Sequence, residues 1–106
     1  MIVVTTADIA GKKITRTLGL VRGNTIRSRH VGKDILAVFR MLVGGEVHEY
    51  TKMLAESREQ AVDRMVDEAR QLGANAIVEM RFTTSQLAQG AAELMAYGTA
   101  VTVEDA

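Results

Sequence analysis

The stretch from Glu46 to Thr84, EVHEYTKMLAESREQAVDRMVDEARQLGANAIVEMRFTT, changes its hydrophobic period at Gly73. Before this glycine, apolar residues recur every three, four or seven positions, which predicts one long amphipathic helix over residues 46–72. Gly73 stands where a glycine commonly closes a helix. After it, Asn75 to Thr84 alternates between apolar and polar residues, which predicts a strand. A long helix therefore leads directly into a strand.

The alternation in residues 75–84 assigns side chains to the two faces of that strand. It places four apolar residues on one face, namely Ala76, Val78, Met80 and Phe82. Ile77 is the exception, since it falls among the polar residues of the other face.

The rest of the chain adds shorter elements on both sides of this pair. A second helix is predicted over 34–42, where apolar residues have helical spacing before the break at Gly44-Gly45. Strands are predicted from β-branched and alternating patterns. They cover 2–6, 14–29 and 93–103, with a turn over 7–13, a bend or bulge near Gly23-Asn24 and a loop over 85–92.

These elements predict a single α+β domain over residues 1–106, with the order β-β-α-α-β-β. We expect two layers, an antiparallel or mixed sheet with the long helix packed on it, in the manner of a dodecin-like subunit. The crossover from strand 14–29 to strand 75–84 should be parallel and right-handed. Strand 93–103 should lie between them. Its small face (Ala96, Gly98, Ala100) suits close approach by another backbone or a helix.

Composition excludes several classes of protein. The 106 residues include no Cys, so disulfides, thiolate metal sites and cysteine nucleophiles are absent. No apolar run approaches the roughly 20 residues that span a bilayer, and the N-terminus has no basic segment before an apolar one. We therefore expect a cytoplasmic protein without a membrane partner.

The net charge of zero hides an asymmetry along the chain. Residues 1–42 hold eight basic and two acidic side chains, whereas residues 43–106 hold five basic and eleven acidic ones. One interpretation is a half that binds anions or nucleic acid. The other, which we favour, is that the basic strand pairs with the acidic helix within or between subunits. Only four aromatic residues are present, and they do not alternate with basic residues in the pattern that proteins use to stack nucleobases. Nucleic acid is therefore not expected as a partner.

The predicted sheet also carries more apolar residues than a solvent-exposed face needs. One long helix covers only one face of a sheet, and the predicted strands 14–29, 75–84 and 93–103 each have an apolar face. Exposed apolar patches larger than a few hundred Å² usually mark association. We therefore expect a homo-oligomer.

Several short stretches occur in an order and spacing that resemble a known family. They are Val21-Arg22-Gly23, Met41 to Gly45, Glu49-Tyr50, Gly73 to Val78 and Tyr97 to Val101. Together they resemble the YbjQ-like family of small, uncharacterised, mostly bacterial proteins that are labelled heavy-metal-binding. The resemblance implies a two-layer α/β subunit that assembles into a ring, typically a pentamer, with no established reaction.

Four residues form the candidate metal site. His30 and Asp34 stand four positions apart at the start of the expected helix 34–42, and Glu46 and His48 follow the Gly-Gly break. Imidazole and carboxylate groups can hold a divalent ion such as Zn²⁺ or Ni²⁺ if three or four of them converge. The alternative is surface histidines and first-turn carboxylates favoured by the helix dipole. Five methionines (Met41, Met53, Met65, Met80, Met95) could attract copper, but core filling is the favoured interpretation.

No catalytic arrangement is evident in the sequence. Ser57, Ser85 and Thr99 have no base and orienting group at recognisable spacing, and no glycine-rich phosphate-binding pattern occurs. We therefore expect a non-enzymatic, ring-forming binding or scaffold protein of unknown ligand. The alternatives are a small enzyme with its site at the subunit junctions and an RNA-binding ring that uses residues 12–29.

Overall fold

The computed structural model describes residues 1–27, 48–88 and 91–106. Its elements are β1 (Ile2–Val3), β2 (Lys12–Arg27), α2 (His48–Gln71), β3 (Ala76–Ala88) and β4 (Ala91–Asp105). One helix packs on a four-stranded mixed sheet, so the α+β class and the long helix are confirmed. The helix predicted over 34–42 lies outside the described residues.

The strands lie in the order β1-β3-β4-β2. β4 runs antiparallel to both β2 and β3, whereas β1 is parallel to β3. The prediction that the last strand lies between the other two long ones is confirmed, and β2 and β3 are consequently parallel to each other. The handedness of their crossover stays a prediction. Within the described residues, the outer edge of β2 has no strand neighbour along its 16 residues.

The helix ends as its sequence predicted. Gly73 has a φ of 85°, and its amide donates a hydrogen bond to the Arg70 carbonyl at 3.0 Å. The Ala74 amide donates to the Ala69 carbonyl at 3.1 Å, which completes the pattern of a glycine-terminated helix. Asn75 then holds the turn against β4, because its side chain donates to the Val103 carbonyl (2.9 Å) and accepts from the Val103 amide (2.8 Å).

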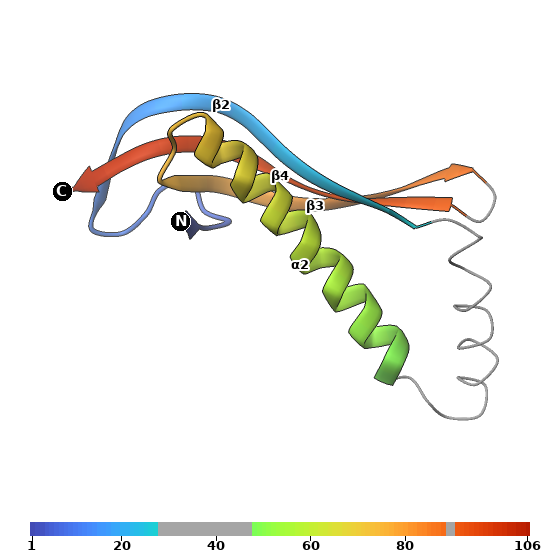
Figure 1. Cartoon of the computed structure of the whole chain (residues 1–106). Helices are drawn as coiled ribbons and strands as arrows, with labels where there is room; N and C mark the ends of the chain where they lie inside the picture. Colours follow the sequence, from blue (N-terminus) through green and yellow to red (C-terminus); the bar gives the residue numbers. More distant parts are fainter. Residues whose placement is uncertain (28–47, 89–90) are drawn as a thin grey trace.

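α2 covers one face of the sheet, which we call the inner face (Figure 1). The small side chains of Ala96 and Ala100 on β4 are fully buried there, which confirms that this face of β4 receives the helix. Gly23 of β2 lies directly beneath α2. The other buried residues of the inner core are Val21, Ala61, Met65, Ala69, Ile77 and Met80, and partly buried residues such as Leu18 pack against them.

A bulge in β3 makes the predicted face assignment wrong. The register between β3 and β4 shifts between Val78 and Arg81, and Glu79 adopts a φ of 56°. This extra residue reverses the alternation, so Met80 joins Ile77 in the inner core while Ala76 and Val78 face outward. Ile77 is thus a central core residue, with no exposed surface, and not an exception.

The outer face is also partly covered, which corrects the expectation that it stays open. Ala76, Val78, Val101 and Val103 form a second buried cluster, against which Val4 and Ile9 pack. Backbone hydrogen bonds hold this N-terminal segment beside β3 beyond the two residues of β1: the Val4 amide donates to the Ile77 carbonyl at 3.0 Å, and the Glu79 amide donates to the Thr6 carbonyl at 3.0 Å.

Two local predictions were wrong because strand pairing extends or shifts the elements. Residues 85–88 and 91–92 belong to β3 and β4, where Ser85 pairs with Glu93 and Gln86 with Ala92, so most of the expected loop is a strand ladder. The irregularities of β2 lie between Ile14 and Arg16 and between Thr17 and Gly19. The ladder runs in regular register past Gly23-Asn24, the site expected to bend.

Candidate functional site

The four predicted metal ligands cannot be assembled from the described residues. His30, Asp34 and Glu46 lie outside them, and His48 is the first residue of α2. Within 1–27, 48–88 and 91–106, no group of three or more His, Cys, Asp or Glu side chains is placed to hold a metal ion. The donor chemistry itself is informative, since a chain without Cys offers no thiolate for soft heavy metals.

Two of the five methionines, Met65 and Met80, are buried in the inner core. Met65 has no exposed surface, and Met80 is 8% exposed. Both pack among apolar side chains, which confirms core filling at these two positions. Ser57 of α2 is likewise buried, at 4% exposure, so its hydroxyl is not presented to a substrate in solution.

A groove with a volume of about 740 Å³ lies between α2 and β3. We call it the α2–β3 groove, and it is lined by Ala55, Arg58, Glu59, Val62, Asp63 and Phe82. Helical spacing places the first five on the flank of α2 that faces β3, since they lie three or four positions apart. Phe82 faces them because the bulge at Glu79 turns it to the inner face.

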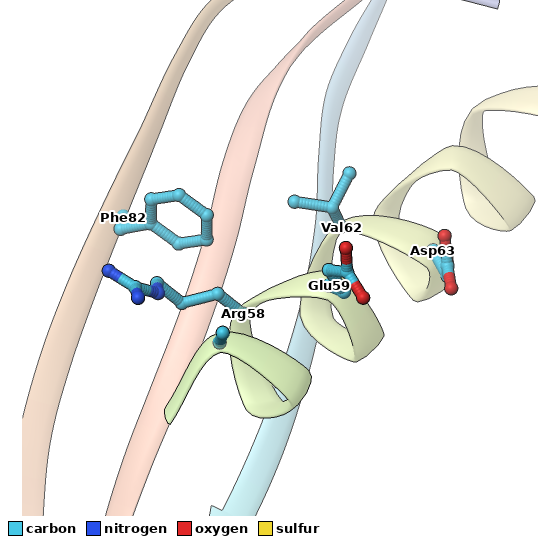
Figure 2. A pocket seen from close by; sticks show the side chains of 6 residues that line it. Arg58, Glu59, Val62, Asp63 and Phe82 are labelled. Atoms are coloured by element: carbon cyan, nitrogen blue, oxygen red, sulfur yellow. The ribbon is translucent and has the colours of Figure 1, made fainter. Parts of the chain in front are cut away.

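The groove combines an exposed aromatic ring with charged side chains. Phe82 is 44% exposed, a large fraction for an aromatic residue on a helix-covered face. Figure 2 shows Arg58 extending from α2 toward Phe82, while Asp63 lies farther along the helix. An open groove of this kind suits an apolar side chain of a binding partner, with charges at its rim that orient the partner.

A second open surface lies on the outer face of β2. Val21, Gly23 and Thr25 are buried toward the helix. The residues that alternate with them along β2 therefore point to the outer face. We call these residues the outer strip: Leu20, Arg22, Asn24 and Ile26. Leu20 is 64% exposed and Ile26 is 56% exposed, so this strip carries apolar surface that the N-terminal segment does not cover.

In the part of the chain that the structure describes, no ion pair joins β2 to α2. The ion pairs among the described residues are Lys12–Asp105, Arg70–Asp67 and Arg81–Glu79. None of them joins β2 to α2, although Arg64 of α2 donates a hydrogen bond to the Asn24 carbonyl of β2. Pairing of the basic strand with the acidic helix, within or between subunits, therefore stays a prediction.

Lys12 and Asp105 connect the far ends of β2 and β4. The Lys12 Nζ lies 2.6 Å from Oδ1 of Asp105. The hydrogen bond from Lys12, reinforced by its positive charge, lowers the pKa of the Asp105 carboxyl below its ordinary value of 3.8. Because Asp105 is exposed, this pair fixes the strand ends and adds little to the stability of the whole domain.

Comparison with known proteins identifies the family. A family profile described as "Putative heavy-metal-binding" matches residues 1–104. The chain belongs to this YbjQ-like family. A UPF0145 protein of Dehalococcoides mccartyi is 60% identical over 98% of this chain and 100% of its own length. UPF0145 proteins of Methanosarcina acetivorans (97% of each chain) and Clostridium perfringens (100% of each) are 56% and 58% identical.

A solved structure has the same fold as this YbjQ-like chain. It is a protein of unknown function from Pediococcus pentosaceus, of the DUF74 family. The TM-score is 0.66 over 98% of each chain, at 17% sequence identity. At this identity the likeness establishes the fold alone. No helix among the described residues is both long and apolar enough to span a membrane.

The sequence did not single out the residues of the groove. Phe82 was assigned to the face of Ala76 and Val78, because nothing in the sequence marks Glu79 as a bulge residue. Val62 and Arg58 belong to the long helix, but their partner strand could not be identified from helical spacing alone. The signal that could have found the groove is Phe82 itself, an aromatic residue near the end of the alternating stretch that is followed by Thr83 and Thr84.

Proposed function

We propose that the protein is a non-enzymatic binding or scaffold module that assembles into a homo-oligomeric ring, a pentamer by resemblance to the YbjQ-like family. The observation that carries the proposal is the extended shape of the subunit. Its radius of gyration is 17.0 Å, and its principal extents are 53 × 26 × 17 Å. A compact domain of this length has a radius of gyration of about 13 Å.

The surface area supports the same proposal. The chain exposes 7079 Å². A compact monomeric protein of 11.5 kDa exposes about 5,800 Å² by the usual scaling. The excess, on the order of 1,300 Å², approaches what two standard interfaces of about 800 Å² each would remove from one subunit. An assembly in which every subunit has two neighbours would cover this excess.

The heavy-metal label of the family fits this chain poorly in its literal sense. Without thiolates the chain is a weak host for soft metals, and its candidate donors are two imidazoles and two carboxylates. We therefore place the binding function on a ligand held between subunits, with Zn²⁺ or Ni²⁺ at His30, Asp34, Glu46 and His48 as one candidate.

Native mass spectrometry of untagged protein purified without a chelator tests the proposal. We expect one discrete oligomer, with a mass five times that of the 11.5 kDa chain for the pentamer. The same spectrum reports any bound ion as an added mass. A monomer at micromolar concentration would overturn the assembly on which the proposal depends.

A further inference from the structure

Two uncovered apolar surfaces lie on opposite faces of the subunit. The α2–β3 groove opens on the inner face, where Phe82 is 44% exposed. The outer strip lies on the other side of the sheet, where Leu20 and Ile26 are more than half exposed. Because the sheet separates them, they cannot contact each other within one chain.

The two surfaces also carry opposite charge. The groove contributes two carboxylates, Glu59 and Asp63, and neither is in an ion pair among the described residues. Its one guanidinium, that of Arg58, extends toward the ring of Phe82 (Figure 2). The outer strip contributes one charge, that of Arg22, which is exposed and likewise takes part in none of the ion pairs described. An arginine between two apolar side chains complements an aromatic groove with a carboxylate rim.

The position of β2 makes the outer strip reachable. β2 is an edge strand of the sheet, and its neighbour on the other side is β4. Leu20, Arg22 and Ile26 are also exposed on the outer face, so a second chain can approach the strip from that side without displacing a strand. A contact between two different surfaces of identical chains is head-to-tail, and such contacts close into rings when the rotation between neighbours permits.

We propose that the outer strip of one subunit docks into the α2–β3 groove of the next, with Arg22 against Glu59 and Asp63. The occupant of the groove is a second copy of this chain, because the complementary surface is present on the same molecule and the excess exposed area is of the size that such contacts bury. This inference rests on the proposed assembly and specifies which surfaces form it.

Charge reversal tests the pairing. Arg22→Glu and Asp63→Arg should each raise the concentration needed for half-assembly by at least about tenfold, since like charges then oppose each other at the interface. The two substitutions combined in one chain should restore assembly, because every head-to-tail contact regains one opposite pair. Lys13→Glu and Glu56→Arg are the matched controls: both residues are exposed and lie outside the two surfaces, so assembly should be unchanged.

A cross-linking experiment keeps the test decisive if a reversed-charge variant misfolds. The chain has no Cys, so Arg22→Cys/Asp63→Cys introduces the only two thiols. A short bismaleimide should link them between subunits and give a ladder of multimers on a denaturing gel. Arg22→Cys/Glu56→Cys, with one thiol moved away from the groove, should give a much weaker ladder.

The outcomes separate this inference from the proposed assembly. If the wild-type protein is a monomer, both fail. If it is an oligomer whose mass survives both single reversals, or if the combined variant does not reassemble, the interface lies elsewhere and only this inference is overturned. If the protein is an oligomer but the Arg22→Cys/Asp63→Cys variant gives no ladder of cross-linked multimers, only this inference is overturned. The occupant of the groove would then be a different protein.

Discussion

Gly23 of β2 and Ala61 of α2 are packed so closely that no side chain fits between them. A Cβ added at Gly23 would overlap the Ala61 carbonyl oxygen and the Met65 amide nitrogen, and would lie 2.7 Å from the Cβ of Arg64. Two of these three neighbours are backbone atoms of the helix. Gly23 therefore sets the distance between the two layers.

Gly23→Ala should destabilise the fold by about 3 kcal/mol, the top of the usual range for overpacking, because helix backbone cannot move aside as a side chain can. Chemical denaturation monitored by circular dichroism measures the loss. Thr17→Ala, at an exposed position of the same strand, is the control and should stay within about 0.5 kcal/mol of wild type. Equal stability of the Gly23 variant would show that the layers are not in contact there.

Gly98 of β4 is predicted to reject a side chain for a different reason. A Cβ there would lie 2.7 Å from Cγ2 of Ile77 and 3.0 Å from the Val78 carbonyl oxygen, both on β3. Gly98→Val should cost about 1–3 kcal/mol in the free energy of unfolding and weaken any assembly that depends on the intact sheet.

A double-mutant cycle isolates the contact between Gly98 and Ile77. Leucine lacks the β-branch methyl that a Cβ at position 98 would meet. Ile77→Leu should therefore reduce the cost of Gly98→Ala, and the two changes should be non-additive by at least about 0.5 kcal/mol. If the two changes in the free energy of unfolding are additive, the cost of Gly98→Ala does not come from contact with the Ile77 side chain.

Glu79 adopts a left-handed backbone conformation, with a φ of 56°. Asparagine tolerates this region and β-branched residues do not. Glu79→Val should therefore destabilise the protein by about 1–2 kcal/mol, whereas Glu79→Asn should be nearly neutral. Loss of the exposed ion pair with Arg81 is common to both variants, so the difference in melting temperature between them reports the backbone alone.

The Lys12–Asp105 pair predicts a specific pH dependence. The folded pKa of Asp105 is lowered below its ordinary value of 3.8, so the pair contributes above that pH. The contribution disappears as the pH falls through the folded pKa and the carboxylate is protonated. An NMR titration of the Asp105 carboxyl carbon should give a midpoint below 3.8, and Lys12→Gln should return it to that value. The same midpoint in both proteins would contradict the pairing.

The histidine site makes a prediction about zinc. If His30, Asp34, Glu46 and His48 converge, chelator-stripped protein should bind Zn²⁺ at about pH 7.5 and lose affinity as the pH drops through about 6.5, where imidazole becomes protonated. Isothermal titration calorimetry compares the wild type with His30→Ala/His48→Ala. Equal heats for the two proteins would rule out the histidines as ligands.

Much of the fold follows from local patterns in the sequence. The period change at Gly73 fixed the helix and the start of β3, and the run of small residues at Ala96, Gly98 and Ala100 indicated the face of β4 that meets the helix. These features depend only on residues that are close together in the chain, so they can be predicted from a single sequence.

The errors arose where pairing between distant segments determines the conformation. The bulge at Glu79 is stabilised by the backbone of residues 4–6, which are more than seventy positions away in the chain. The extension of β3 and β4 past Ser85 likewise depends on their mutual ladder. The candidate metal site involves His30, Asp34 and Glu46, which lie outside the described residues, so that part of the prediction stays untested.

The bulge at Glu79 also bears on how the length of this chain can vary during evolution. Residues on either side of it, Val78 and Met80, already face opposite ways, so deleting residue 79 would leave every other side chain of β3 on its present face. A deletion in the regularly paired stretch from Arg81 to Gln86 would exchange inner and outer positions along the part of the strand that follows it. Position 79 is therefore where a shorter relative could lose a residue and keep both its cores.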